Sequence, residues 1–512
     1  MTIGKEKILH LSVLAVAGLF LFSALSLKPP HFDEGINGFF VNQVWAKGFY
    51  DYNPNNYHGP LFFYLLQISE KVFGFGVGSF RFVTALFSLL AIWFVMRSSS
   101  VLGRYGSYAA AVAMALSPGV IFFGRSAIHE AVFVFFQILW MVGFVMLREK
   151  SDRQAVVLFL AGLFGCLVLK ETFVILGMAF AVAWAWVEIS PEVLKKTSAG
   201  RKVERPRRKK GEALPKYFLL KAGTAAVLVW LVLYTGFFRN WKGASDFFEA
   251  VAPWLKTGVS ASGHDKPSYY WLELILKYEW PALAGLAGAC VGVFGRSWKM
   301  RFFSALSLVN LMIYSFIPYK TPWCIIDILW PLFFVAGLWA EQLHGRFLEG
   351  KGFFYPLAAG IVAAILMRSA LVGYRVNFVR YTDPREPYVY VQTKNDIKVV
   401  EDIIGRKIST SPEFHNMKIL MKLKDSWPLP WVFSRFPDLR YGDYKTPGGG
   451  DADVIFGETN VNEEGLRGLY VRRKIELRDS RAPIYVYLKR STFEGMNLPG
   501  FVPLSGQGEG GS

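Results

Sequence analysis

The sequence predicts a polytopic α-helical membrane protein with a C-terminal soluble α/β domain, and three observations support this fold class. Hydrophobic residues make up 53% of the 512-residue chain, and aromatic residues make up 16%. Apolar windows long enough to span a bilayer recur between residues 8 and 373. After residue 374 these windows stop and short β-rich runs begin. This composition excludes an ordinary soluble protein with one large core.

The first 373 residues predict about eleven transmembrane helices, one from each apolar window of spanning length. The windows lie near 8–27, 79–96, 107–123, 130–147, 155–170, 172–189, 217–237, 280–296, 301–317, 322–340 and 353–373. Lys28-Pro29-Pro30 follows the first window, where a signal-peptide cleavage site would need small residues. We therefore expect the first helix to stay attached as a signal anchor.

The basic residues predict the orientation of these helices. With the N-terminus in the cytoplasm, the basic connections all face the cytoplasm, as the positive-inside rule requires. These connections lie at 97–104, 148–153, 195–210, 296–301 and 344–351. The net charge of +18 then reflects topology and contact with anionic lipids, so no nucleic-acid partner is expected. We expect a multi-pass protein of the cell (inner or plasma) membrane, and the odd number of spans places its C-terminal domain on the extracytoplasmic side.

Unusual polar residues of the hydrophobic region gather on the side opposite the basic connections. Two adjacent carboxylates, Asp33 and Glu34, follow the first window directly and are costly to hold near lipid unless they face water, a cavity or a ligand. The extracytoplasmic loop at 31–78 also alternates polar and aromatic residues, which predicts short interfacial helices. The remaining members of this set are Tyr57, His58, Arg125, His129, Glu130, Lys170, Glu171, His264, Asp265, Lys266, Tyr319 and Lys320. Their shared side predicts an enzyme.

The composition changes near residue 374, which divides the chain into a transmembrane domain at 1–373 and an α/β domain at 374–512. Short β-rich runs occur at 387–392, 417–423, 453–457 and 484–488. A helical pattern at 396–405 lies between the first two runs, so we expect a small domain of mixed strands and helices. The Gly-rich ending predicts a flexible tail.

Several motifs, taken in order, resemble the GT-C superfamily of membrane glycosyltransferases. The carboxylate pair, Y-H-G-P-L at 57–61 and S-P at 117–118 with the following G-R-S-A-I-H-E resemble its protein mannosyltransferase and aminoarabinose-transferase branch. Other motifs look like the flippase-activity-associated family found near glycan-assembly loci. These are H-D-K-P at 264–267, P-Y-K-T-P-W at 318–323, P-Y-V-Y-V-Q-T at 387–393 and W-P-L-P-W at 427–431.

The resemblance implies a polyprenyl-phosphate-linked sugar donor, an active site on the extracytoplasmic face and transfer with inversion. It implies that Asp33 is the catalytic base, with Glu34 orienting the acceptor or binding a metal. Arg125 and Lys320 are the expected contacts of the leaving phosphate, since both side chains bind phosphate well. The further substrate-binding candidates are His58, Glu130, Lys170, His264, Asp265 and Tyr319. Two departures stand out: His-Gly-Pro replaces the mannosyltransferases' His-Pro-Pro, and His129-Glu130 occupies the place of a single expected acid.

Three alternatives stay open at this stage. Lys170 and Glu171 could form an ion pair with each other in a broken helix. Glu34, His58 and His264 could bind a divalent metal, although their spacing favours hydrogen bonds to substrate, and no other cofactor is expected. The chain could also be a flippase for a lipid-linked sugar or a non-catalytic partner in cell-surface glycan assembly. The absence of a visible repeat and the one-sided charges weaken the transporter reading, and the acceptor (protein, lipid or glycan) is not identified.

Overall fold

The computed structural model forms two compact units. The structure describes residues 3–150, 152–197, 203–206, 215–259, 263–348, 354–443, 451–458, 463, 465–478 and 482–504. One unit, the helical unit, comprises Met1–Leu25 and Val41–Tyr381, and the other, the sheet unit, comprises Ser26–Phe40 and Thr382–Ser512. Most of the basic connection at 195–210 and the tail after residue 504 lie outside the described residues.

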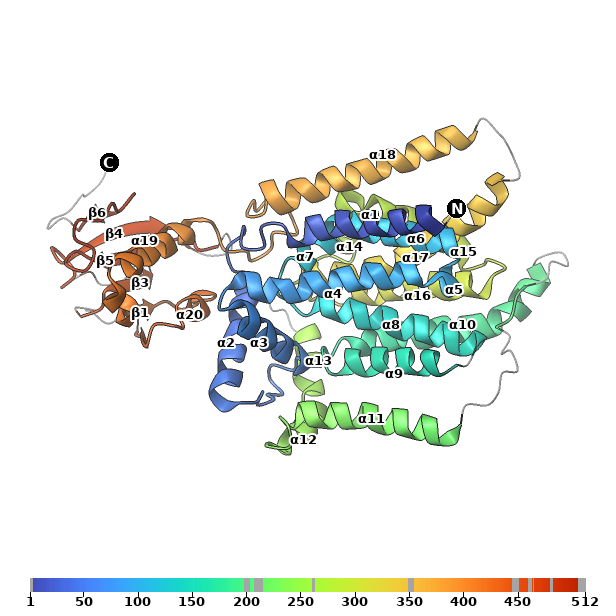
Figure 1. Cartoon of the computed structure of the whole chain (residues 1–512), viewed down its shortest axis with the longest axis horizontal. Coiled ribbons are helices and arrows are strands. Elements are labelled where there is room, and N and C mark those ends of the chain that lie inside the picture. The colour runs from blue at the N-terminus through green and yellow to red at the C-terminus, as the bar shows by residue number, and fades with distance from the viewer. Residues whose placement is uncertain are drawn as a thin grey trace. The chain divides into compact units, whose positions relative to one another are not determined.

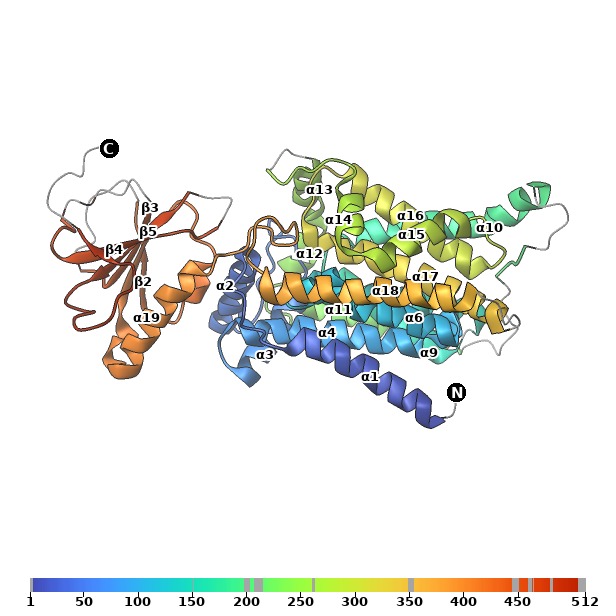
Figure 2. The same ribbon diagram turned by 90° about the horizontal axis from the view of Figure 1, so that it is seen from above.

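Long helices form the helical unit and run roughly parallel in two perpendicular views (Figures 1 and 2). They are α1 (Ile3–Phe22), α4 (Val77–Arg97), α6 (Arg104–Ala115), α8 (Glu130–Glu149), α9 (Arg153–Leu167), α10 (Phe173–Thr197), α11 (Lys216–Tyr234), α15 (Trp280–Gly292), α16 (Trp298–Phe316), α17 (Ile325–Leu348) and α18 (Phe354–Tyr374). The short helix α7 (Pro118–Gly124) follows α6 and is bent by 61° from it. Each apolar window of the sequence coincides with one of them, or with the bent pair α6 and α7. The predicted polytopic helical protein is therefore confirmed.

The number of spans is less than the number of apolar windows when length and composition are applied strictly. Among the described residues, six helices are long and apolar enough to cross a membrane, or up to seven if the bent pair counts as one span. The helices α9 and α15 are apolar but short. The count of about eleven spans thus stays a prediction.

Shorter helices connect the long ones. They are α2 (Phe32–Lys47), α3 (Leu61–Phe73), α5 (Ser99–Leu102), α12 (Lys242–Glu249), α13 (Val251–Val259) and α14 (Tyr270–Tyr278). Helices α2 and α3 occupy the loop at 31–78, where the sequence predicts short helices. The boundary between the two units falls within α2, after Phe40.

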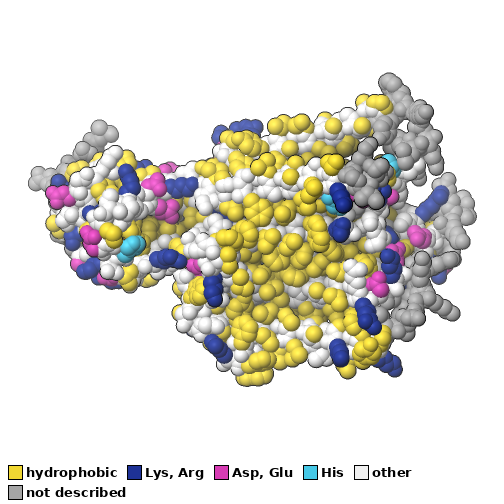
Figure 3. All heavy atoms as spheres, viewed as in Figure 1, with side chains coloured by type: hydrophobic (Ala, Val, Ile, Leu, Met, Phe, Trp, Pro, Cys, Tyr) yellow, Lys and Arg dark blue, Asp and Glu magenta, His cyan; other side chains and the backbone are white. Residues whose placement is uncertain are grey.

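Small residues allow the long helices to pack closely. A Cβ atom at Gly162 of α9 would lie 2.1 Å from the backbone nitrogen of Trp140 in α8, so only glycine permits this approach. Close packing through small residues is the usual way in which helices associate in lipid. Hydrophobic side chains cover a broad area over these helices (Figure 3), and α11 and α18 are only 11% buried. Such exposed apolar helices suit contact with lipid.

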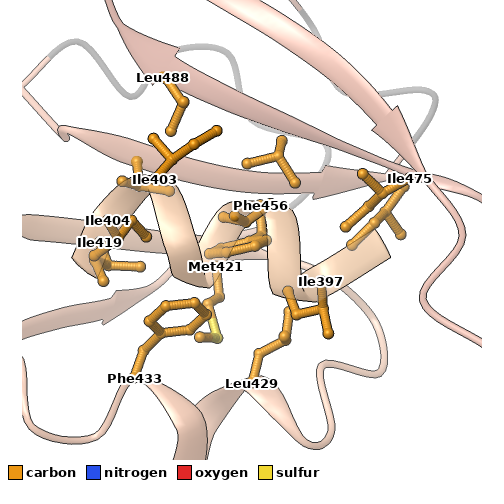
Figure 4. Close-up of a cluster of buried hydrophobic side chains, with 14 of the residues drawn as sticks. Ile397, Ile403, Ile404, Ile419, Met421, Leu429, Phe433, Phe456, Ile475 and Leu488 are labelled. Carbon is orange, nitrogen blue, oxygen red and sulfur yellow. The ribbon is translucent and has the colours of Figure 1, made fainter. Parts of the chain in front are cut away.

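The sheet unit contains a six-stranded mixed sheet in the order β2-β1-β3-β5-β4-β6. The strands are β1 (Lys418–Lys422), β2 (Asp438–Tyr441), β3 (Val454–Glu458), β4 (Tyr470–Ile475), β5 (Ile484–Lys489) and β6 (Val502–Pro503). Strand β1 pairs in parallel with β2 and β3, and the other neighbours are antiparallel. Helix α19 (Asp396–Thr410) packs on the sheet through apolar residues such as Ile397 and Ile403 (Figure 4).

Three of the predicted β-rich runs are strands, and one is not. Strands β1, β3 and β5 lie in the runs at 417–423, 453–457 and 484–488. The run at 387–392 forms turns and bends, so the strand expected there is wrong. Its polar groups instead bond to the segment that precedes α2, because the Tyr390 carbonyl and the Gln392 side chain both have partners there. The sequence did not reveal β2, β4 and β6, which are short or rich in charged residues.

Candidate functional site

The carboxylate pair lies in the first turn of α2, in the sheet unit. Glu34 is fully buried, and its Oε2 accepts a hydrogen bond of 2.7 Å from the backbone N–H of His31. This contact satisfies a donor at the helix start that has no partner within the helix. The side chain of Asp33 is 30% exposed, and within the described residues its carboxylate makes no hydrogen bond of its own. The pair thus contains one structural acid and one accessible acid.

His31 holds the backbone of Asp33. The Asp33 N–H donates to His31 Nδ1 over 3.0 Å, and His31 Nε2 contacts the Tyr390 carbonyl at 2.7 Å. A ring that accepts at Nδ1 and donates at Nε2 is the neutral tautomer. Burial lowers the pKa of His31, which favours the same neutral form. The Asp33 Oδ2 atom lies 3.9 Å from Nδ1, so the imidazole borders the accessible carboxylate.

In the helical unit, the Y-H-G-P-L motif lies against the connection between α9 and α10. The Gly59 N–H donates to the Leu169 carbonyl over 3.0 Å, and the Leu61 N–H donates to the Val168 carbonyl over 3.2 Å. A Cβ at Gly59 would lie 2.2 Å from the Val168 oxygen. Glycine is therefore required, and a proline here would also lack the N–H that bonds to Leu169. This contact explains why His-Gly-Pro replaces His-Pro-Pro.

His58 and His129 bring three loops of the helical unit together. His58 Nδ1 lies 3.0 Å from Glu171 Oε2, and the His58 side chain is 29% exposed. The His129 ring lies 4.5 Å from the His58 ring and 4.3 Å from the ring of Phe62. The His129 Nε2 atom is buried and has no hydrogen-bond partner within the described residues. The predicted polar residues of these loops therefore do converge.

Lys170 forms a buried ion pair with Glu130, and not the pair with Glu171 that the sequence left open. Both side chains are almost completely buried, at 5% and 1% exposure. The Sγ atom of Cys324 lies 3.9 Å from Glu130 Oε1, and Thr321 Oγ1 lies 3.5 Å from that sulfur. The ion pair therefore joins the start of α8 to the connection between α9 and α10, and the Cys324 contact joins Glu130 to the segment that precedes α17.

The H-D-K-P and P-Y-K-T-P-W motifs lie side by side. Asp265 and Tyr319 form an isolated antiparallel β-bridge, and the Lys320 N–H donates to the His264 carbonyl over 3.1 Å. The rings of His264 and Tyr319 are 5.0 Å apart. Lys320 Nζ donates to the carbonyls of Lys266 and Ile317. An ammonium group has three donors, so one donor of Lys320 stays available for a ligand.

The Arg125 side chain lies at the C-terminal end of α1. Its guanidinium donates to the carbonyls of Phe20, Leu21, Ser23 and Ala24 at distances of 2.5–3.3 Å. The buried Arg81 donates to the next carbonyl, that of Leu25, over 2.7 Å. Two positive side chains at a helix C-terminus satisfy its last carbonyls and complement its dipole. The Arg125 donors that we expected at a phosphate thus contact the main chain of α1.

Two buried acids of the helical unit were not among the sequence candidates. Glu279 accepts from Ser117 Oγ over 2.7 Å and from the Gly119 N–H over 2.6 Å, so it holds the start of α7. Asp327 accepts from Gln137 and Tyr314 across three helices. A carboxylate directly before Trp-Pro, or inside an apolar window, was the signal that could have revealed them.

The residues proposed as metal ligands do not form a cluster in the part of the chain that the structure describes. Among the described residues, no group of three or more His, Cys, Asp or Glu side chains could hold a metal ion. Glu34 belongs to the sheet unit, whereas His58 and His264 belong to the helical unit. His58 and Glu34 each have a protein partner already.

Comparison with known proteins supports the fold independently. Residues 57–199 match the family model described as dolichyl-phosphate-mannose-protein mannosyltransferase. No curated protein matches the sequence. The structure of ArnT from Cupriavidus metallidurans bound to undecaprenyl phosphate is similar to this chain, with a TM-score of 0.62 and 14% identity over 96% of this chain and 99% of that one. The apo structure of the same ArnT gives a TM-score of 0.58 and 15% identity over 94% and 98% of the two chains. The full-length similarity and the segment match show that the chain has the GT-C fold of membrane glycosyltransferases.

Proposed function

We propose that this chain is an integral-membrane glycosyltransferase of the inverting type. It takes a sugar from a polyprenyl-phosphate-linked donor and transfers it to an acceptor hydroxyl on the extracytoplasmic face of the cell membrane. The observation that carries the proposal is the fold similarity to ArnT, which extends over almost the whole of both chains and includes a state bound to undecaprenyl phosphate. The accessible carboxylate of Asp33 beside a buried Glu34 supplies the chemistry that such a transfer needs.

Asp33 is the proposed catalytic base. The carboxylate takes the proton of the acceptor hydroxyl while the acceptor oxygen bonds to the anomeric carbon of the sugar. The bond between that carbon and the phosphate oxygen breaks, and polyprenyl phosphate leaves with the electron pair. Single displacement of this kind inverts the anomeric centre. Neutral His31 and buried Glu34 hold the backbone around Asp33, which keeps the base in place.

Lys320 is the proposed contact of the departing phosphate. Its backbone is held by the β-bridge between the H-D-K-P and P-Y-K-T-P-W motifs, and two of its ammonium donors bind main-chain carbonyls. The third donor can stabilise negative charge as it develops on the phosphate. Arg125 donates from Nη1 and Nη2 to four main-chain carbonyls at the end of α1, so in this proposal its positive charge acts from that helix end.

The test is transfer of a radiolabelled sugar from its polyprenyl-phosphate donor by purified protein in nanodiscs. Asp33→Asn keeps the shape of the side chain but removes its ability to accept a proton, so turnover should fall by about a hundredfold or more. Asp402→Asn, which alters an exposed acid of α19, is the matched control and should leave turnover unchanged. Glu34→Gln should have a milder effect. Near-normal turnover by Asp33→Asn would remove Asp33 as the base.

The two rival functions predict different results in the same system. A flippase, reconstituted in sealed vesicles, would move labelled donor from one leaflet to the other without forming a glycosylated product. An assembly partner would show neither transfer nor movement with any polyprenyl-phosphate sugar and any acceptor. If the wild type shows no turnover but moves the donor, the flippase function is supported. If it shows neither, the assembly-partner function is supported.

A further inference from the structure

One face of α2 has no side chains where the C-terminal part of the chain meets it. Gly35 and Gly38 are three residues apart, so they lie on the same face of the helix. A Cβ at Gly35 would lie 2.5 Å from Pro428 Cβ, and a Cβ at Gly38 would lie 2.3 Å from Trp431 Cδ1. Contacts this short leave no room for a methyl group. The W-P-L-P-W segment at 427–431 therefore seats directly on the helix that begins with Asp33.

The W-P-L-P-W segment is itself fixed to the sheet unit. Leu429, in its centre, is fully buried in the core formed by α19 and the sheet (Figure 4). Trp431 is 2% exposed. The first aromatic of the motif, Trp427, meets the ring of Phe39 edge to face at 5.6 Å. The segment thus connects a rigid core to the glycine face of α2.

A second contact holds the chain just before α2. The Gln392 side chain donates to the Pro29 carbonyl over 2.8 Å, and the Tyr390 carbonyl bonds to His31. The guanidinium of Arg478 lies 4.6 Å from the ring centroid of Phe32. Residues 29–39 are therefore held by two segments, at 390–392 and 427–431, that are far away in the sequence. We call these two segments the α2 clamp.

We propose that the α2 clamp sets the position of the Asp33 carboxylate, so that Pro428, Trp431 and Gln392 are positioning residues for the transfer reaction. This inference rests on the proposed function. General-base catalysis needs the carboxylate within hydrogen-bond reach of the acceptor hydroxyl. A displacement of about 1 Å can lower the rate by about a hundredfold. The C-terminal domain then acts as part of the catalytic apparatus, although none of its residues contacts the reacting atoms.

Gly38→Ala tests the α2 clamp with the smallest possible change. Alanine favours a helix over glycine, so α2 itself should form at least as well. The added methyl must push α2 away from Trp431, and kcat should fall about tenfold to a hundredfold, whereas KM for the lipid-linked donor should stay constant. Gly405→Ala is the matched control, because its Cβ in α19 meets nothing within 4 Å. A simultaneous rise in KM and loss of melting temperature would indicate general damage and overturn the positioning role.

Two further variants keep the test decisive. Gln392→Met removes the hydrogen bond to Pro29 while preserving most of the shape, and it should lower kcat in the same direction. Gly38→Ala combined with Trp431→Leu removes the ring that the new methyl meets. Because the two changes act on one contact, the double variant should be no slower than Gly38→Ala alone, whereas independent effects would multiply.

Amide hydrogen exchange reads the α2 clamp without any substrate. Amides of residues 33–38 should be protected in the wild type and in Gly405→Ala, and they should exchange faster in Gly38→Ala. Equal kcat and equal exchange in Gly38→Ala and Gly405→Ala would overturn the inference and leave the proposed function standing. Protected α2 amides in a wild type that shows no turnover would instead overturn the proposed function, since the packing would be present without the activity.

Discussion

Removal of Lys170 should destabilise the protein strongly, because its partner is buried. Glu130 and Lys170 are 1% and 5% exposed, and each is the direct ionic partner of the other. In Lys170→Met the Glu130 carboxylate keeps its burial but loses its counter-charge. Breaking a buried pair in this way costs about 3–5 kcal/mol. We expect a loss of that size in the free energy of unfolding, measured by SDS titration in mixed micelles.

An exposed ion pair provides the control for this prediction. Lys47 and Asp51 form an ion pair of 2.7 Å with side chains 49% and 38% exposed, so Lys47→Met should cost no more than about 1 kcal/mol. The double variant Glu130→Gln with Lys170→Met removes both charges and should recover much of the lost stability. Wild-type stability in Lys170→Met together with weakened binding of polyprenyl phosphate would refute this reasoning. That result would make Lys170 the substrate-binding residue that the sequence predicts.

Two further predictions separate binding from folding and test the topology. Lys320→Ala should weaken binding of polyprenyl phosphate in nanodiscs by about 1.5–3 kcal/mol, the usual loss for a charge-assisted contact, at constant melting temperature. Arg125→Ala removes the donors that bond to the last carbonyls of α1, so it should lower the melting temperature more than the affinity. If instead Arg125→Ala weakens binding and Lys320→Ala lowers the melting temperature, Arg125 and not Lys320 is the phosphate contact. If the C-terminal domain is extracytoplasmic, a cysteine at Ser426 should react with a membrane-impermeant maleimide in spheroplasts, whereas one at Ser100 should react only after lysis. Labelling of Ser100 with protection of Ser426 would invert the predicted topology.

The sequence by itself determined where the long apolar helices and three of the six strands lie. A sufficiently long run of apolar residues can cross lipid as a helix, which pairs its own backbone N–H and C=O groups. This property depends only on the residues within each window. Every window from 8–27 to 353–373 accordingly coincides with a helix or the bent pair. The runs at 417–423, 453–457 and 484–488 are strands for an equally local reason, since alternating apolar residues suit a half-buried sheet. The carboxylate pair at Asp33 and Glu34 was also recognisable from its place after the first apolar window, whereas only the structure shows that Glu34 is buried and Asp33 is accessible.

Only the tertiary structure decided which charges pair and what holds the site together. Lys170 lies next to Glu171 in the chain but pairs with Glu130, forty positions away, because the fold buries those two side chains against each other. The run at 387–392 alternates like a strand, yet its polar groups bond to residues 29–31, which no local pattern could indicate. The need for glycine at positions 35 and 38 is likewise visible only in the fold, where Pro428 and Trp431 leave no room for a Cβ atom. Which buried side chains contact each other depends on how distant segments pack, and such contacts leave no periodic pattern in the sequence.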